Sequence, residues 1–238
     1  MTTYRSRVRR GRLLVRGAAM RGTDPPRSDP MPPDADRPFT ADDLDRLAEV
    51  AVAAWREGLD RDWSTPAGTL EWSCRRTADH AVDAVLAVGL FLAARKDDGY
   101  PDWGWGELTM GPSARPADLV EGLATVARAL SAVVRASPPD VRAVIWRRPR
   151  LEVRGPVDFA PRGGLELVLH AHDVAAGLGV PFAPPAEVCA RLRDHTRDWP
   201  HWRSPGWCPP PTTDDPWHDL LVGSGRARET PSQEGSSR

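Results

Sequence analysis

Cysteine and lysine are both scarce in this 238-residue chain. The three cysteines, Cys74, Cys189 and Cys208, lie far apart and form no Cys-x-x-Cys pair. Their number and spacing support neither a disulfide framework nor a cysteine-based zinc knuckle, and they fit a reducing, cytoplasmic environment. Lys96 is the only lysine, so arginine carries nearly all the positive charge. We attribute this preference for arginine over lysine to a GC-rich coding sequence and draw no functional conclusion from it.

Long apolar runs and strand-like alternation are also lacking. The longest apolar run, residues 81–94, is interrupted by Asp83 and falls short of the roughly 20 residues that a membrane-spanning helix requires. We therefore expect no membrane partner. Alternation of apolar and polar residues occurs only at residues 151–154, which makes a large sheet improbable on pattern alone.

The overall charge excludes one further class of partner. The formal net charge is −1, so no field of one sign draws the folded body to nucleic acid. A content of 40% hydrophobic and 27% charged residues is ordinary for a soluble globular protein. The ten tryptophans leave a homodimer open as an alternative to a monomer.

Residues 1–38 differ from the rest of the chain, because they are rich in arginine and proline and lack an apolar period. We expect a disordered basic arm here. Arg9-Arg10 is weakly similar to a twin-arginine export signal, but Arg16 interrupts the apolar segment that such a signal needs. Met1, Met20 and Met31 all remain open as the translation start. Residues 39–226 are expected to form the folded domain, and residues 227–238 a disordered tail.

Apolar residues at helical spacing, with capping residues at the ends, predict four long helices within the folded domain. They cover residues 40–58, 73–94, 115–136 and 163–178. Shorter helical pieces are predicted at residues 139–146, 185–197 and 217–222. Four long helices with short connections predict the all-α class, specifically an antiparallel four-helix bundle with extra short C-terminal helices.

A polar stripe on the last long helix is the strongest functional signal. In Leu165-Glu-Leu-Val-Leu-His-Ala-His-Asp173, Glu166, His170 and Asp173 lie within one narrow strip of the helix, and apolar residues occupy the other faces. Such a helix is buried, so its polar strip is expected to face the interior. A divalent cation would satisfy a carboxylate and an imidazole one turn apart. His80, in the middle of the second helix, is the candidate for a third ligand.

Several alternatives remain open at this point. Two histidines and one carboxylate suit zinc, but they equally match the facial triad of mononuclear iron. Asp83 and Asp173 each follow a histidine by three residues, so they are either partners of the free ring N–H or helix-surface residues. Glu166 and His170 would also be explained by a hydrogen bond to each other or an ion pair with an arginine. A second cluster has metal-like residue types but irregular spacing: His195, His201, Cys208 and His218.

Three stretches resemble the mycothiol-dependent maleylpyruvate isomerase N-terminal family of DinB/YfiT-like metal-binding bundles. They are Trp72-Ser-Cys-Arg-Arg-Thr-Ala-Asp-His80, the Leu165–Asp173 stretch, and Asp215-Pro-Trp-His-Asp-Leu-Leu-Val-Gly-Ser-Gly-Arg226. The resemblance covers roughly residues 39–226, although Glu71 stands where the family usually has glycine. It implies a DinB-like bundle in which His80, Glu166 and His170 bind a divalent metal, most simply zinc.

The resemblance also implies an activity, that of an isomerase or S-transferase using a low-molecular-weight thiol such as mycothiol. The metal would take the thiol as thiolate, and the sulfur would attack an electrophilic substrate. Arg154 and Arg162 are candidates for holding a substrate carboxylate. The alternative is a non-catalytic metal-binding or interaction bundle.

Overall fold

The computed structural model describes residues 37–101, 109–111, 113–147 and 150–229, all within one unit, Pro32–Arg238. This part of the chain contains six α-helices and little strand, which confirms the predicted helical class. The predicted basic arm lies outside the described residues except for its last two positions. Of the predicted tail, only residues 227–229 are described.

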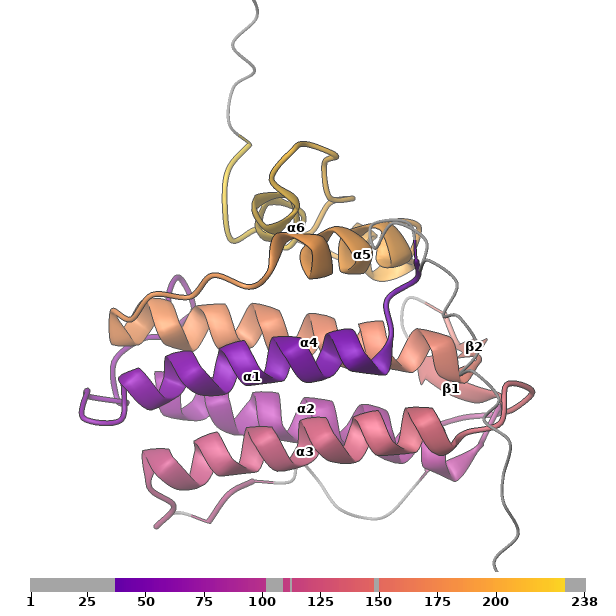
Figure 1. The fold of residues 1–238 in the computed structure, drawn as a ribbon, viewed down its shortest axis with the longest axis horizontal. Helices are drawn as coiled ribbons and strands as arrows, with labels where there is room; N and C mark the ends of the chain where they lie inside the picture. Colours follow the sequence, from indigo (N-terminus) through magenta and orange to yellow (C-terminus); the bar gives the residue numbers. More distant parts are fainter. Residues whose placement is uncertain (1–36, 102–108, 112, 148–149, 230–238) are drawn as a thin grey trace, which may run out of the picture. The chain divides into compact units, whose positions relative to one another are not determined.

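Four long helices run side by side (Figure 1). They are α1 (Ala41–Glu57), α2 (Cys74–Ala94), α3 (Pro116–Ala136) and α4 (Pro156–Leu178). The first three agree closely with the predicted ranges, because local capping signals set their ends. Thr40 and Asp43 form a capping box at α1, and the Ser73 hydroxyl accepts a hydrogen bond from the Arg76 backbone N–H at 3.2 Å.

Each of the four long helices packs against at least two others. Both α1 and α2 pack against α3 and α4. Arg135 near the end of α3 pairs with Asp42 at the start of α1, so α1 and α3 are antiparallel. Cys74 at the start of α2 lies against Gly177 at the end of α4, so this pair is antiparallel too.

The other two neighbouring pairs run parallel, which corrects the expected all-antiparallel order. Gly58 after α1 lies against Leu178 at the end of α4, and Gly89 of α2 lies against Leu130 of α3. The parallel run of α2 and α3 requires a connection that returns along the helices. Residues 95–115 join α2 to α3 in the sequence.

A two-stranded sheet replaces the short helix predicted at residues 139–146, and that prediction is wrong. Strand β1 (Ala143–Trp146) pairs antiparallel with β2 (Glu152–Arg154), with Val144 opposite Val153. All four β1 residues are buried, and β-branched and aromatic side chains favour a strand in such a place. The alternation seen at residues 151–154 was therefore a real strand signal.

Helix α4 begins seven residues before the predicted start at Gly163. Pro156 occupies its first position, where a missing backbone N–H costs nothing, and Pro161 lies inside the helix. The predicted range of 163–178 left Pro161 outside the helix. In the structure Gly163 serves close packing, because a Cβ there would collide with the Leu130 side chain of α3.

Gly177 is needed for the approach of α4 to the segment before α2. A Cβ at this position would lie 2.5 Å from Cys74 Sγ and would also collide with the Pro66 carbonyl oxygen. We expect Gly177→Ala to lower the free energy of unfolding by about 1–3 kcal/mol through overpacking. Urea denaturation measures this loss. Gly122→Ala in α3 is the control: it meets only ordinary contacts, so it should leave stability unchanged or raise it. Equal effects of the two changes would contradict the packing argument.

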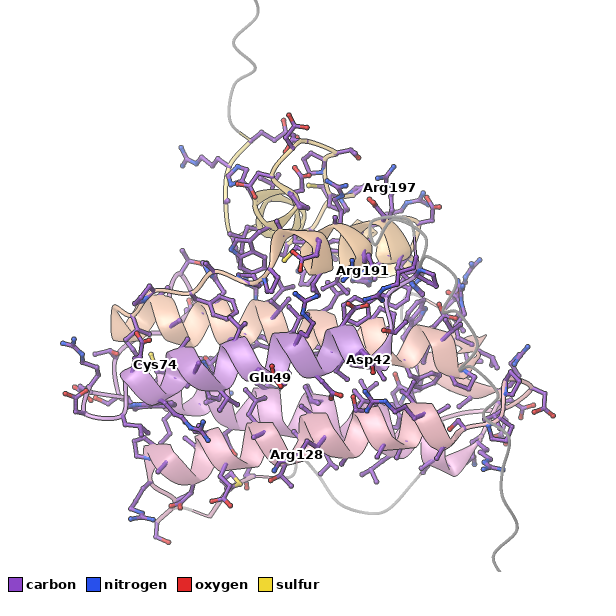
Figure 2. The ribbon with its side chains drawn as sticks, in the orientation of Figure 1. Asp42, Glu49, Cys74, Arg128, Arg191 and Arg197 are labelled. Carbon is purple, nitrogen blue, oxygen red and sulfur yellow. The ribbon has the colours of Figure 1, made fainter. Side chains whose placement is uncertain are left out.

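The C-terminal part adds three short helices, as predicted in outline. They are α5 (Ala186–Thr196), the 3-10 helix η1 (Pro200–Arg203) and α6 (Pro216–Gly223). Helix α5 packs on α4 and on α6. Figure 2 shows Arg191 between α5 and α1, where its guanidinium reaches Asp43 at 2.6 Å. The C-terminal segment is therefore joined to the long helices by a buried ion pair.

Helix α2 corrects the expectation that no segment could span a membrane. Among the described helices, it alone is long and apolar enough by length and composition, since it continues N-terminally beyond the apolar run at residues 81–94. The core helix of a soluble protein passes the same test, and α2 packs against both α3 and α4.

Candidate metal centre

The three predicted ligands come together between α2 and α4. His80 lies in the middle of α2, and Glu166 and His170 lie one turn apart on α4. One ligand atom from each residue falls within 4.8 Å of the others, and the two imidazole rings are 5.0 Å apart, nearly perpendicular. Tetrahedral zinc with ligands at about 2.0–2.1 Å places neighbouring ligand atoms about 3.4 Å apart. A contraction of about an ångström would therefore bring the set to that geometry.

The Glu166 carboxylate presents its two oxygens to different partners. Oε1 forms an ion pair with Arg162 at 2.6 Å, whereas Oε2 lies 3.6 Å from Nε2 of His170. Burial by itself acts to raise the pKa of Glu166, but the Arg162 charge and the contact with His170 hold it well below its usual range. The carboxylate is therefore ionised, with one oxygen left facing the imidazoles.

The His170 ring is held on its other side by Asp173. Nδ1 of His170 lies 3.2 Å from Oδ2 of Asp173, as the His-x-x-Asp spacing predicted. Burial acts to lower the pKa of His170, but Asp173 and Glu166 together raise it above its usual value. Because Nδ1 is engaged by Asp173, Nε2 is the nitrogen that faces Glu166.

The His80 ring lies between two other rings. Its centroid is 5.3 Å from that of Trp72 and 5.0 Å from that of His170, both in edge-on geometry. Arg76 in turn lies over the Trp72 ring at 4.3 Å. The eight-residue spacing between Trp72 and His80 thus places an aromatic ring against the candidate ligand.

Nδ1 of His80 is a buried nitrogen without a hydrogen-bond partner among the described residues. Asp83 was expected to hold this ring, but it makes no hydrogen bond to that nitrogen. An unpartnered buried polar atom costs about 1–3 kcal/mol, so it is an exception that calls for a partner. An imidazole beside an ionised carboxylate and a second imidazole is a donor set that suits zinc or iron.

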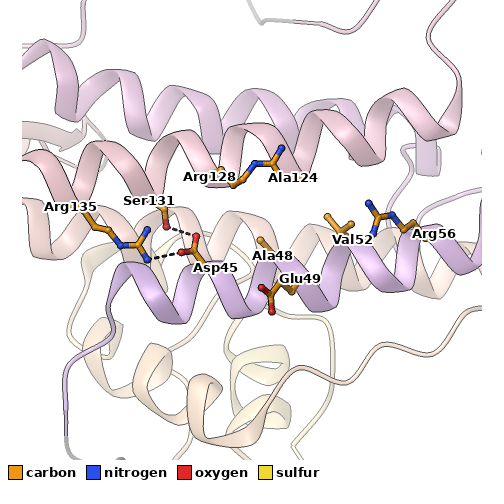
Figure 3. A pocket seen from close by; sticks show the side chains of 9 residues that line it. All are labelled: Asp45, Ala48, Glu49, Val52, Arg56, Ala124, Arg128, Ser131 and Arg135. Carbon is orange, nitrogen blue, oxygen red and sulfur yellow. Dashed lines mark hydrogen bonds and ion pairs between the residues drawn. The ribbon is translucent and has the colours of Figure 1, made fainter. Parts of the chain in front are cut away.

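A cavity of about 270 Å³ adjoins two of the three candidate ligands, Glu166 and His170. Its remaining walls come from α4 and from the C-terminal segment: Arg162, Leu165, Leu169, His201, Ser204, Trp207 and Arg226. A larger cavity of about 590 Å³ lies elsewhere, between α1 and α3 (Figure 3). There Asp45 bonds to Ser131 and Arg135 across the groove, and none of the three candidate ligands takes part.

The two arginines proposed for substrate binding differ in position. Arg162 lines the smaller cavity, but its guanidinium is already engaged by Glu166. Arg154 lies on β2, where it pairs with Glu152 at 2.5 Å, and it does not line this cavity. The structure therefore places only Arg162 beside the candidate metal centre.

The second predicted cluster does not gather into a site. His195 pairs with Asp158 at 3.0 Å, and the His201 ring packs among tryptophans, 4.7 Å from Trp202. Within the described part of the chain, His80, Glu166 and His170 are the one group of three or more residues that could jointly hold a metal ion. Cys208 and His218 belong to no such group.

Arg226 is the neighbour of the site that sequence reasoning missed. It binds both oxygens of Asp173, at 2.9 and 2.7 Å, from 53 residues away. Its only sequence signal was its place at the end of the third family-like stretch.

No family model matches the chain, and no match is found among curated proteins or solved structures.

Proposed function

We propose that the four long helices form a DinB-like bundle that binds one divalent metal, preferably zinc, through His80, Glu166 and His170. The observation that supports this is the meeting of three ligand atoms from two helices within 4.8 Å. A nitrogen of one of them, Nδ1 of His80, is also buried without a partner. We further propose that the metal serves a thiol-dependent isomerase or S-transferase with a mycothiol-like cosubstrate.

The neighbouring residues suit this role. Three protein ligands leave a coordination position open, which is typical of catalytic zinc sites. A bound divalent metal would act as a Lewis acid that deprotonates a coordinating thiol at neutral pH. Arg162 fixes one oxygen of Glu166, and Asp173 fixes the ring of His170. The adjoining cavity is where an electrophilic substrate would meet the sulfur.

A second function is favoured by a specific observation, the ion pair between Arg162 and Glu166. Together with the contact between His170 and Asp173, it satisfies both carboxylates without any metal. On this alternative the polar stripe is a structural network, or a non-catalytic metal site, in an interaction bundle. The basic arm or a second copy of the chain would then serve partner binding.

Metal content separates a metal centre from a purely structural network. We expect purified wild-type protein to contain about one transition metal ion per chain and His170→Ala to lose it clearly, because a catalytic-type site has only three protein ligands. Plasma mass spectrometry on folded samples measures both. His172→Ala is the matched control, since His172 lies on the same helix but packs against Trp217 at 5.5 Å, and it should keep the metal.

A thiol arm of the same experiment addresses catalysis. Cobalt(II)-loaded wild-type protein should develop a sulfur-to-cobalt absorption band when a small thiol is added, because an open position admits the thiolate. Metal binding without this band would favour the non-catalytic site. Negligible metal in all three proteins would reject the metal proposal altogether.

A further inference from the structure

We propose that Arg226 is a positioning residue of the metal centre, which sets the metal affinity by orienting Asp173. Arg226 touches none of the candidate ligands directly. It binds Asp173, and Asp173 binds the ring of His170. The inference rests on the proposed function, since it assumes that His170 is a ligand.

The geometry of the Arg226–Asp173 pair is that of a fixed fork. Nε of Arg226 donates to Oδ1 at 2.9 Å, and Nη2 donates to Oδ2 at 2.7 Å. The two side chains are only 9% and 2% exposed, so solvent competes little with the pair. Bidentate pairs of this kind impose orientation as well as attraction. The plane of the Asp173 carboxylate is therefore set by Arg226.

Asp173 in turn orients the ring of His170. An ionised carboxylate only accepts hydrogen bonds, so Nδ1 of His170, 3.2 Å from Oδ2, carries the proton. The lone pair is then on Nε2, which lies 3.6 Å from Glu166. A partner of this kind, outside the ligand set, typically changes metal affinity about 10–100-fold when it is removed.

Arg226 itself is placed by the end of α6. Its backbone N–H donates to the Leu221 carbonyl at 2.8 Å, and Gly225 just before it has a positive φ of 72° that turns the chain back after the helix. One of its guanidinium nitrogens also reaches the Ser224 carbonyl at 3.4 Å. Hydrogen bonds within the C-terminal segment thus hold Arg226 in place beside α4. Loss of the Arg226 side chain would therefore release Asp173.

A purely structural clamp is the competing explanation, and the chain offers a matched control for it. Arg193 of α5 pairs with Asp219 of α6 at 2.6 Å, with side chains 8% and 1% exposed. This pair lies in the same C-terminal segment and is equally buried. Among the described residues its further hydrogen bonds go to Asp194 and Thr213 and to no histidine, so its loss should affect stability alone.

The test is a zinc titration against a chromophoric chelator on folded full-length protein, with circular dichroism to verify folding. We expect Arg226→Met to weaken zinc binding about 10–100-fold and Arg226→Lys to weaken it less, because lysine keeps the charge without the fork. Arg193→Met should be destabilised with an unchanged zinc dissociation constant. If Arg226→Met does not fold, Arg226→Lys carries the comparison.

The outcomes separate the inference from the proposal beneath it. Wild-type protein that binds no zinc would refute the metal centre, and the inference with it. If wild-type protein binds zinc and both Arg226 variants bind it with the wild-type affinity, the inference alone is refuted. Equal weakening in Arg193→Met would also overturn it, because general docking rather than Arg226 would then set the affinity.

Discussion

Asp43→Asn is expected to lower the free energy of unfolding by about 3–5 kcal/mol, as is typical when one partner of a buried ion pair is removed. Asp43 in α1 and Arg191 in α5 are joined at 2.6 Å, and both side chains are fully buried. The asparagine keeps the volume but removes the negative charge that faces the Arg191 guanidinium in the core. Urea or guanidinium denaturation followed by circular dichroism measures the difference.

The pH dependence of stability gives the same pair a second signature. Burial acts to raise the pKa of Asp43, but hydrogen bonds from Arg37 and Arg191 lower it to about 2. A lowered folded-state pKa adds stability that is complete above about pH 4 and is lost as the pH falls towards 2. The contribution amounts to about 2 kcal/mol. The difference in free energy of unfolding between wild type and Asp43→Asn should therefore narrow as the pH falls from about 4 towards 2.

The chain contains a control between the same two helices. Arg46 of α1 and Glu187 of α5 are also paired, at 2.5 Å, but their side chains are 44% and 42% exposed. Glu187→Gln should therefore cost less than about 1 kcal/mol. If Asp43→Asn were no more destabilising than Glu187→Gln, burial of the first pair would not be what fastens α5 to α1.

Sequence reasoning succeeded where the signal is local. Thr40, Ser73 and Pro116 are capping or first-turn residues, and α1, α2 and α3 begin where these residues indicate. A cap acts through backbone groups within one turn, so a short window of sequence contains the whole interaction. The helix ends were therefore predictable without knowledge of the packing.

It failed where the partner is distant in sequence. Ala143–Trp146 forms a strand because Glu152–Arg154 pairs with it and the core covers it. Helix α4 begins at Pro156 rather than at Gly163, and Gly163 packs against Leu130 of another helix. In both cases tertiary packing overrides the local preference, which no short window can reveal.

The candidate site shows the same division. Helical periodicity placed Glu166 beside His170, and the middle of α2 supplied His80. Asp83 and Asp173 have identical spacing from their histidines, but Asp173 lies 3.2 Å from Nδ1 of His170, whereas Nδ1 of His80 has no hydrogen-bond partner among the described residues. What distinguishes them is Arg226, which orients Asp173 from a remote turn. The ligands were predictable from pattern, but the residues that orient them were not.

Zinc is expected to raise the thermal stability of the wild-type protein strongly. At a free zinc concentration of a thousand times the dissociation constant, the folded state gains about 4 kcal/mol, or about 8–16 °C in Tm for a chain of this size. The gain arises because the ligands come from α2 and α4 and meet only in the folded state. Scanning calorimetry with and without zinc measures it.

His80→Ala should abolish nearly all of this shift, since it removes the only ligand that α2 supplies. Glu166 and His170 would remain one turn apart on α4, a pair that persists in any helical state and so couples zinc weakly to folding. His172→Ala, which alters an imidazole of α4 outside the candidate site, should keep the shift. An undiminished shift in His80→Ala would place the zinc elsewhere. It would also show that α2 and α4 are not joined by a common ion.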